Sequence, residues 1–292
     1  MIDRLHRLSF SFTCIILTVL VFHNPAFGEK GHLVIIGGGD RPGYLMEKIS
    51  ALAPDEEPVV RVIPNASGAP IETAEYQVNQ FAELGIDDVD YIYLTREQAQ
   101  QDSAVQLLHD VDVIFFSGGD QRRLVEHLGD TPFLDAIHRI YEQGGVISGT
   151  SAGAAVMSNI MITGDEHLNE DEEYKFTVIK QDNIITREGF GFISSAIIDQ
   201  HFITRKRHNR LISLVLAHPE LVGIGIDEST AIVVAPDKTF QVLGENTVLV
   251  YDAHKAENIT IDDRGNYATQ NLQMHLLQSG QRYDLQSNTI LD

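Results

Sequence analysis

Cysteine and tryptophan are almost missing from this sequence. Tryptophan is absent, and the one cysteine, Cys14, lies inside an apolar segment near the amino terminus. If that segment is removed, the mature chain can contain neither a disulfide nor a catalytic thiol. The scarcity of cysteine therefore excludes the Cys-His class of hydrolases for an exported protein.

Basic residues are half as frequent as acidic residues. The chain has 21 Lys and Arg against 42 Asp and Glu, which gives a formal net charge of −21. Binding to a phosphate backbone needs clustered Lys and Arg, so nucleic acid is excluded as a partner. Two interpretations of the acidity stay open: it serves solubility alone, or it also attracts cationic substrates.

An uncharged apolar run spans Leu8 to Phe22, after the basic residues Arg4 and Arg7. Small residues follow and end at Gly28. A basic start, a short apolar run and a small-residue end are typical of a secretory signal peptide, and the run is short for a membrane span. We expect residues 1–28 to be a cleaved signal peptide and residues 29–292 to form a single domain.

This leader predicts an exported protein, periplasmic or secreted, with no membrane association after cleavage. An uncleaved amino-terminal anchor is the alternative.

Short apolar runs alternate with amphipathic stretches along the first half of the chain. The runs end in glycine-rich or polar turns, and helix-like stretches such as Ile71–Leu84 and Thr131–Gln143 lie between them. This alternation predicts an α/β fold with a parallel sheet and helices on both faces. The loops at the carboxyl ends of such strands carry the ligand site, so Gly37–Asp40, Ser117–Gln121 and Gly149–Gly153 are expected at one edge.

The remaining segments give weaker patterns. Acidic residues crowd Thr163–Lys175, which we interpret as a solvated loop or insertion. Three short runs, Ala231–Ala235, Thr239–Val242 and Thr247–Tyr251, predict antiparallel hairpins that close the domain. The polar tail beyond Ala253 gives no clear pattern.

The pentapeptide Gly149-Thr150-Ser151-Ala152-Gly153 follows the apolar pair Val146-Ile147 and opens a run of small residues. A strand, a sharp turn and a helix in this order form a nucleophile elbow, which lifts one serine hydroxyl above a sheet. The amide after the serine then lies at a helix amino terminus, where it can stabilise an oxyanion. Ser151 is therefore the candidate nucleophile of a hydrolase, although glycine turns also serve packing alone.

A serine nucleophile needs a base, and the base needs an orienting acid. His201 follows the apolar run Ala196–Ile198, which places it at a strand end on the same edge as the elbow. An acid is available in Asp227 or Glu228, again directly after an apolar run. Spacing alone leaves the choice between these two acids open.

One basic cluster stands out in the acidic chain. Arg205, Arg207 and Arg210 lie at the start of a predicted helix that runs from about Arg205 to Ala217. Paired N–H donors on these side chains are suited to a substrate carboxylate. Salt bridges to surface Asp and Glu are the alternative.

Four motifs in order resemble the cyanophycinase family, serine peptidases of family S51 related to aspartyl dipeptidase. They are Ser117-Gly118-Gly119-Asp120-Gln121, the elbow at Ser151, Asp199-Gln200-His201-Phe202 and Gly225-Ile226-Asp227-Glu228. The resemblance covers about Gly31 to Tyr251. It implies a flavodoxin-like three-layer α/β/α fold with a mostly parallel sheet, similar to class I glutamine amidotransferases.

The resemblance also implies roles for individual residues. Ser151, His201 and Glu228 match a catalytic triad, and the Gly119 and Ala152 amides match oxyanion donors. Substrate-binding positions are matched by Gln121, Asp199, Gln200, Arg205, Arg207 and Arg210. The resemblance implies a homodimer, and it implies neither a cofactor nor a metal.

The implied substrate is cyanophycin, a poly-aspartate chain with arginine on each side-chain carboxyl, and the implied product is the β-aspartyl-arginine dipeptide. Two alternatives remain: an exported dipeptidase for other aspartyl or isoaspartyl peptides, and a non-catalytic periplasmic binding protein on the same fold.

Overall fold

In the computed structural model, residues 31–168 and 175–291 are described. The predicted signal peptide and Cys14 lie outside the described residues. Within the described part of the chain, none of the helices has the length and apolar character that a bilayer span requires.

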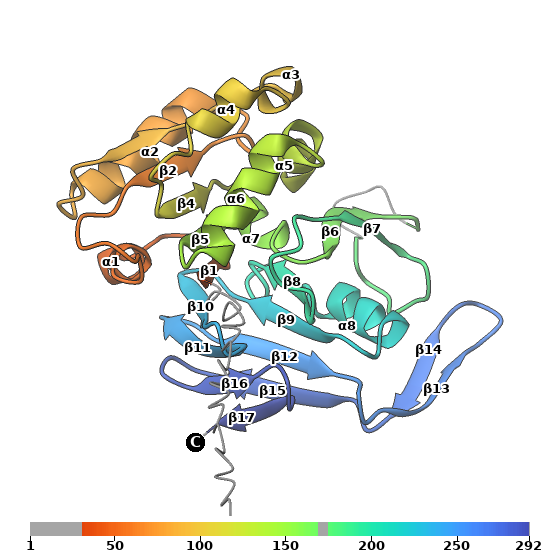
Figure 1. Ribbon diagram of the computed structural model, residues 1–292. Coiled ribbons are helices and arrows are strands. Elements are labelled where there is room, and N and C mark those ends of the chain that lie inside the picture. Colours follow the sequence, from red (N-terminus) through yellow and green to blue (C-terminus); the bar gives the residue numbers. More distant parts are fainter. Residues whose placement is uncertain (1–30, 169–174, 292) are drawn as a thin grey trace, which may run out of the picture.

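A nine-stranded sheet forms the centre of the molecule, in the order β17-β16-β11-β10-β1-β5-β4-β2-β3 (Figure 1). Five strands run parallel: β1 (His32–Ile36), β2 (Val60–Ile63), β3 (Val89–Tyr91), β4 (Val113–Phe116) and β5 (Val146–Thr150). Four antiparallel strands extend the sheet beyond β1: β10 (Thr230–Val234), β11 (Thr239–Gly244), β16 (Arg282–Asp284) and β17 (Thr289–Leu291). The α/β prediction is confirmed, with a mixed sheet that is parallel on the side of the elbow.

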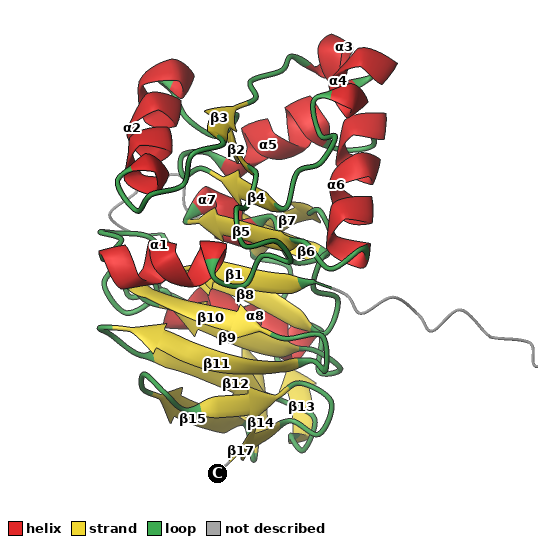
Figure 2. Cartoon of the chain, turned by 60° about the vertical axis from the view of Figure 1, so that its left-hand side comes forward, coloured by secondary structure: helices red, strands yellow, loops and turns green. Residues whose placement is uncertain are grey.

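Helices cover both faces of the parallel strands (Figure 2). On one face lie α1 (Gly43–Ser50) and α2 (Pro70–Ala82), which bury Leu45 and Phe81 against Val34 and Val62. On the other lie α3 (Arg96–Ala99), α4 (Asp102–Gln106), α5 (Gln121–Leu128), α6 (Pro132–Glu142) and the short α7 (Ala152–Ala155). The predicted amphipathic stretches are therefore confirmed as α2 and α6.

A second, four-stranded sheet lies beside the antiparallel half of the first, in the order β15-β12-β9-β8. Its strands are β8 (Ala196–Gln200), β9 (Val222–Ile226), β12 (Val248–Asp252) and β15 (Gln273–Leu277). Helix α8 (His208–Ala217) packs on its outer face through Leu211 and Val215. The predicted run at Thr247–Tyr251 therefore forms a strand, but β12 pairs with β9 and β15 rather than with β11.

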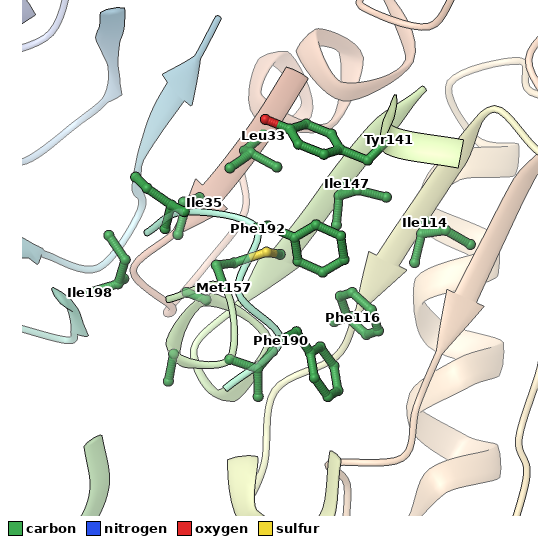
Figure 3. Packing of buried hydrophobic residues seen from close by; sticks show 14 of the residues in the cluster. Leu33, Ile35, Ile114, Phe116, Tyr141, Ile147, Met157, Phe190, Phe192 and Ile198 are labelled. Atoms are coloured by element: carbon green, nitrogen blue, oxygen red, sulfur yellow. The ribbon is translucent and has the colours of Figure 1, made fainter. Parts of the chain in front are cut away.

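One hydrophobic cluster joins the two sheets. Ile35 of β1 and Ile198 of β8 belong to it, together with Phe116, Phe190 and Phe192 (Figure 3). The rings of Phe116 and Phe190 lie 5.3 Å apart between their centroids. Because the two sheets share this core, β8 and β9 are held in a fixed position relative to the elbow.

Two sequence-based interpretations need correction. The acidic stretch begins inside a strand, β6 (Ile160–Glu166), which pairs with β7 (Ile184–Glu188), and Glu166 is buried rather than solvated. Residues 169–174 of that stretch lie outside the described residues. The tail beyond Ala253 contains β13 (Glu257–Ile261) and β14 (Tyr267–Gln270), which form a hairpin, and the three later strands complete the two sheets. Its polar composition hid these strands because most of their side chains face solvent.

Candidate active site

Ser151 lies at a sharp corner between β5 and α7, as the pentapeptide predicted. Its backbone φ is 54° and its ψ is −107°, a conformation that L-residues rarely adopt. A Cβ on Gly149 would lie 2.4 Å from the Gly153 carbonyl oxygen, and one on Gly153 would lie 2.3 Å from the Phe116 oxygen. Both glycines are therefore required by close backbone contacts at the corner.

A chain of hydrogen bonds joins the serine to a histidine and an acid. Ser151 Oγ lies 2.8 Å from His201 Nε2, and His201 Nδ1 lies 2.6 Å from Glu228 Oε1. An ionised carboxylate can only accept, so Nδ1 carries the proton and Nε2 is left to accept from the serine hydroxyl. Asp227, the other candidate acid, instead accepts from the Thr204 amide.

Three consecutive carbonyl groups, beginning with the last residue of β1, hold this chain of residues together. The Ile36 oxygen accepts from the Ser151 amide at 3.0 Å, and the Gly37 oxygen accepts from the His201 amide at 2.8 Å. The Gly38 oxygen accepts from the Ser229 amide, next to Glu228, also at 2.8 Å. One turn thus fixes the backbone of three segments that are far apart in the sequence.

The glycines of this turn also leave room for the two partner side chains. A Cβ on Gly38 would lie 2.3 Å from His201 Cε1, and one on Gly39 would lie 2.7 Å from the Glu228 Cβ. The triple glycine Gly37-Gly38-Gly39, which the sequence placed at the ligand-binding edge of the sheet, therefore seats the histidine and the acid.

The predicted oxyanion donors lie on either side of the serine. The Ala152 amide opens α7, and the Gly118-Gly119 turn follows β4, with a Cβ on Gly118 placed 3.4 Å from the Ser151 Cβ. Within residues 31–168 and 175–291, neither the Gly119 nor the Ala152 amide donates to a protein acceptor. Two such amides beside a nucleophile are suited to a developing oxyanion.

Burial lowers the pKa of His201 below its ordinary value of 6.5, and the charges of Arg205 and Arg207 lower it further. The hydrogen bond that His201 donates to Glu228 acts in the opposite direction without reversing the shift. His201 is therefore neutral near pH 7, which is the form that can accept a proton from Ser151.

We expect kcat/KM to fall as the pH drops through the pKa of His201, with a midpoint below 6.5. Because a nearby positive charge disfavours the imidazolium, Arg205→Met should move this midpoint upward. The pH profile of kcat/KM measures both midpoints, with the exposed Arg139→Met on α6 as the control. A wild-type midpoint above 6.5, or an unchanged midpoint in Arg205→Met, would contradict this prediction.

Two of the predicted substrate-binding residues form a buried ion pair with each other. The Arg210 guanidinium donates from Nε to Asp199 Oδ2 at 2.7 Å and from Nη2 to Oδ1. Both side chains are almost completely buried, and Arg210 lies over the Phe176 ring. In this arrangement the pair anchors α8 to the end of β8.

The other four predicted substrate-binding residues have different surroundings. Arg207 donates to the side-chain and main-chain oxygens of Gln200, and buried Gln121 donates to the carbonyls of Ile162 and Thr163. Arg205 is exposed beyond His201. Substrate binding by these residues stays a prediction. The helix that follows begins at His208 rather than Arg205, because Lys206 adopts a φ of 54°.

A cleft of about 380 Å³ opens over Ser151 and His201. None of the six predicted substrate-binding residues lines it; its far wall comes from the loop after β1 and from α2, and consists of Arg41, Glu72, Thr73, Tyr76 and Gln77. Sequence reasoning missed this wall, although α2 follows the carboxyl end of β2 and so begins at the predicted edge.

No cluster of His, Cys, Asp and Glu with metal-binding geometry occurs among the described residues.

The family model "Peptidase family S51" matches residues 33–242. The chain belongs to peptidase family S51. The match runs from β1 into β11 and includes the whole triad. It confirms the resemblance drawn from the four motifs.

Curated relatives of this S51 peptidase are cyanophycinases. That of Synechococcus elongatus is 32% identical over 271 residues, which cover 90% of this chain and 82% of the relative. That of Nostoc sp. is 32% identical, with 90% and 88% covered, and that of Geminocystis herdmanii is 31% identical, with 87% and 94% covered.

Two solved structures resemble the fold of this S51 peptidase. A peptidase from an acI-B1 Actinobacterium gives a TM-score of 0.59 at 22% identity, covering 87% of this chain and 97% of that one. A protein from Listeria monocytogenes, described as a putative peptidase E, gives 0.50 at 14% identity, covering 74% and 100%. At these identities the likeness concerns the fold alone.

Proposed function

We propose that this protein is an exported serine peptidase that hydrolyses cyanophycin to β-aspartyl-arginine dipeptides through an acyl-enzyme. The observation that carries the proposal is the uninterrupted hydrogen-bonded chain from Ser151 Oγ through His201 to Glu228. The substrate is proposed from the curated cyanophycinases, which are similar over about nine-tenths of this chain.

In the first half of the reaction, His201 Nε2 takes the hydroxyl proton as Ser151 Oγ attacks the backbone carbonyl carbon of an aspartyl residue. The carbonyl oxygen becomes an oxyanion beside the Gly119 and Ala152 amides, whose N–H groups have no acceptor among the described residues. The C–N bond then breaks, and His201 returns the proton to the leaving amine. Glu228 stabilises the imidazolium in between.

In the second half, a water molecule replaces the leaving amine. His201 takes a proton from the water, whose oxygen attacks the ester carbonyl, and the bond to Ser151 Oγ breaks. His201 returns the proton to the serine oxygen, so the enzyme is regenerated. The acyl group leaves as a carboxylic acid, which then loses its proton to the solvent.

Export is proposed from the leader-like residues 1–28. Such a peptidase would act on polymer outside the cell that made the enzyme. The proposed flavodoxin-like architecture, similar to class I glutamine amidotransferases, is supported by the five parallel strands with helices on both faces.

Product analysis tests the substrate. We expect the purified protein to solubilise insoluble cyanophycin, and mass spectrometry to find β-aspartyl-arginine as the main product. Free aspartyl dipeptides, offered in parallel, should be poor substrates. Hydrolysis of those dipeptides alone would replace the proposal by the aspartyl dipeptidase alternative, and no hydrolysis of either would favour the binding protein.

A further inference from the structure

The far wall of the active-site cleft contains an arginine, Arg41, that belongs to none of the sequence motifs. Arg41 follows the triple-glycine turn that seats His201 and Glu228, so its backbone position is tied to the triad. Its side chain lines the same cleft as Ser151 and His201.

The Arg41 guanidinium is held in one orientation. Its Nε and Nη2 both donate to Gln80 Oε1, at 3.3 and 2.8 Å, and its central carbon lies 5.8 Å from the centroid of the Tyr76 ring. The guanidinium has five N–H groups, and Gln80 accepts from two of them, both on the same side. The remaining N–H groups on Nη1 and Nη2 form the outer edge of the guanidinium. Their spacing matches the two oxygens of a carboxylate.

Arg41 has no carboxylate partner among the described residues, although acidic residues outnumber basic ones twofold in the chain. Burial lowers the pKa of this half-buried guanidinium, while Tyr76 and Asp40 act in the opposite direction. Burial makes the charge of this guanidinium less favourable, and a carboxylate that enters the cleft and pairs with it would offset that cost.

Two further polar atoms in the cleft lack partners. Gln77 is 2% exposed and its Oε1 accepts no hydrogen bond, and Thr150, also 2% exposed, has an unpartnered Oγ1. Both residues line the cleft beside Arg41 and Ser151. Buried polar atoms normally have partners, so a ligand with hydrogen-bonding groups next to its anion would complete this wall.

We propose that Arg41 binds a carboxylate of the substrate beside Ser151 and thereby determines specificity for carboxylate-bearing peptides. This proposal depends on the proposed function only for the identity of the substrate. Arg41 supplies the cation, Gln80 and Tyr76 fix its direction, and Gln77 accepts from an N–H of the same ligand. Glu72 on the same wall offers a negative charge to a substrate guanidinium.

The carboxylate has two sources in a β-aspartyl-arginine unit: the α-carboxylate of a terminal aspartyl residue and the α-carboxylate of the pendant arginine. The shared chemistry is a free carboxylate near the scissile bond. Amidation of one carboxylate at a time distinguishes the two sources.

Calorimetric titration of the Ser151→Ala protein tests binding without turnover. The probes are β-aspartyl-arginine and its two mono-amides. We expect Arg41→Met, made in the same background, to weaken binding of the dipeptide by about 10- to 100-fold, as for loss of hydrogen bonds to a charged group. One of the two mono-amides should bind the protein that keeps Arg41 as weakly as the dipeptide binds Arg41→Met. In Arg41→Met, the same amidation should not lower the affinity any further.

Two variants separate this role from a general effect of charge or folding. Arg139→Met removes a positive charge from α6, on the opposite face of the sheet, and should leave binding unchanged. Gln80→Leu keeps the Arg41 charge but frees the guanidinium, so it should weaken binding by less than Arg41→Met. Thermal unfolding of each variant reports its folding.

The proposal is overturned if the dipeptide fails to bind the Ser151→Ala protein, if Arg41→Met changes its affinity less than twofold, or if the substitution and the amidation act independently. Failure of the proposed function looks different. In that case the wild-type protein leaves cyanophycin intact while the Arg41-dependent carboxylate binding persists.

Discussion

Ser151→Ala should lower the turnover of cyanophycin by about 10⁴- to 10⁶-fold while the protein stays folded. The hydroxyl is the group that His201 Nε2 contacts at 2.8 Å, and no other hydroxyl among the described residues bonds to that nitrogen. Without Oγ, the oxyanion donors and the cleft remain but no acyl-enzyme can form. Steady-state kinetics on the polymer measures the loss.

The strained backbone at Ser151 allows a second test, which compares the stabilities of two substitutions at this position. Alanine keeps the cost of a φ of 54°, whereas glycine adopts positive φ freely. Ser151→Gly should therefore be as inactive as Ser151→Ala but more stable by about 1 kcal/mol in the free energy of unfolding. Ser103→Ala, on the exposed surface of α4, is the matched control and should keep full activity. Turnover by Ser151→Ala within tenfold of the wild type would refute the nucleophile assignment.

Gly38→Ala should reduce kcat by at least about 100-fold although it adds only one methyl group. The new Cβ would lie 2.3 Å from His201 Cε1 and 2.5 Å from Nε2, so the imidazole must move away from Ser151. A displacement of about 1 Å in a catalytic group is enough for a loss of this size. The rate at which a small organophosphorus reagent labels Ser151 should fall in parallel.

The control for Gly38→Ala must carry the same backbone strain without the collision. Gly85 has a φ of 86°, against 108° for Gly38, and a Cβ placed on it meets nothing within 4 Å. Gly85→Ala should lose a similar stability, about 1 kcal/mol, and keep its activity. If the two variants lose activity equally, strain rather than displacement of His201 explains the effect.

Local sequence patterns were sufficient for the elements of the first half. Val146 and Ile147 followed by Gly-x-Ser-x-Gly predicted β5, the corner and α7, because close backbone contacts there admit only glycine. Ile71–Leu84 predicted α2 to within two residues at its end. These elements depend on interactions between near neighbours in the chain, which a single sequence displays.

The sequence did not predict to which sheet each of the later strands belongs. The run before His201 and the run before Glu228 were predicted as strands, but both belong to a second sheet that shares a core with the first. The two strands β9 and β10 are separated by only three residues and yet lie in different sheets. Nothing in their apolar composition distinguishes one sheet from the other.

The choice between Asp227 and Glu228 illustrates the same limit within the site. Adjacent residues in a turn point in different directions, so spacing could not decide between them. In the structure, Glu228 accepts from His201 and Asp227 accepts from the Thr204 amide. The ion pair between Asp199 and Arg210 was likewise not predicted, because burial is not visible in a basic cluster.

The sequence by itself determined the α/β class, the elbow at Ser151, and the lack of a cysteine within residues 29–292, because each depends on residue identity or on contacts between near neighbours. The resemblance to the cyanophycinase family implied Glu228 as the orienting acid, a choice that spacing left open. Only the tertiary structure decided that Arg41 and α2 form a wall of the cleft, and that Ile36, Gly37 and Gly38 fix the triad. The physical reason is that these contacts join segments up to about two hundred residues apart, and their geometry follows from packing two sheets around one core.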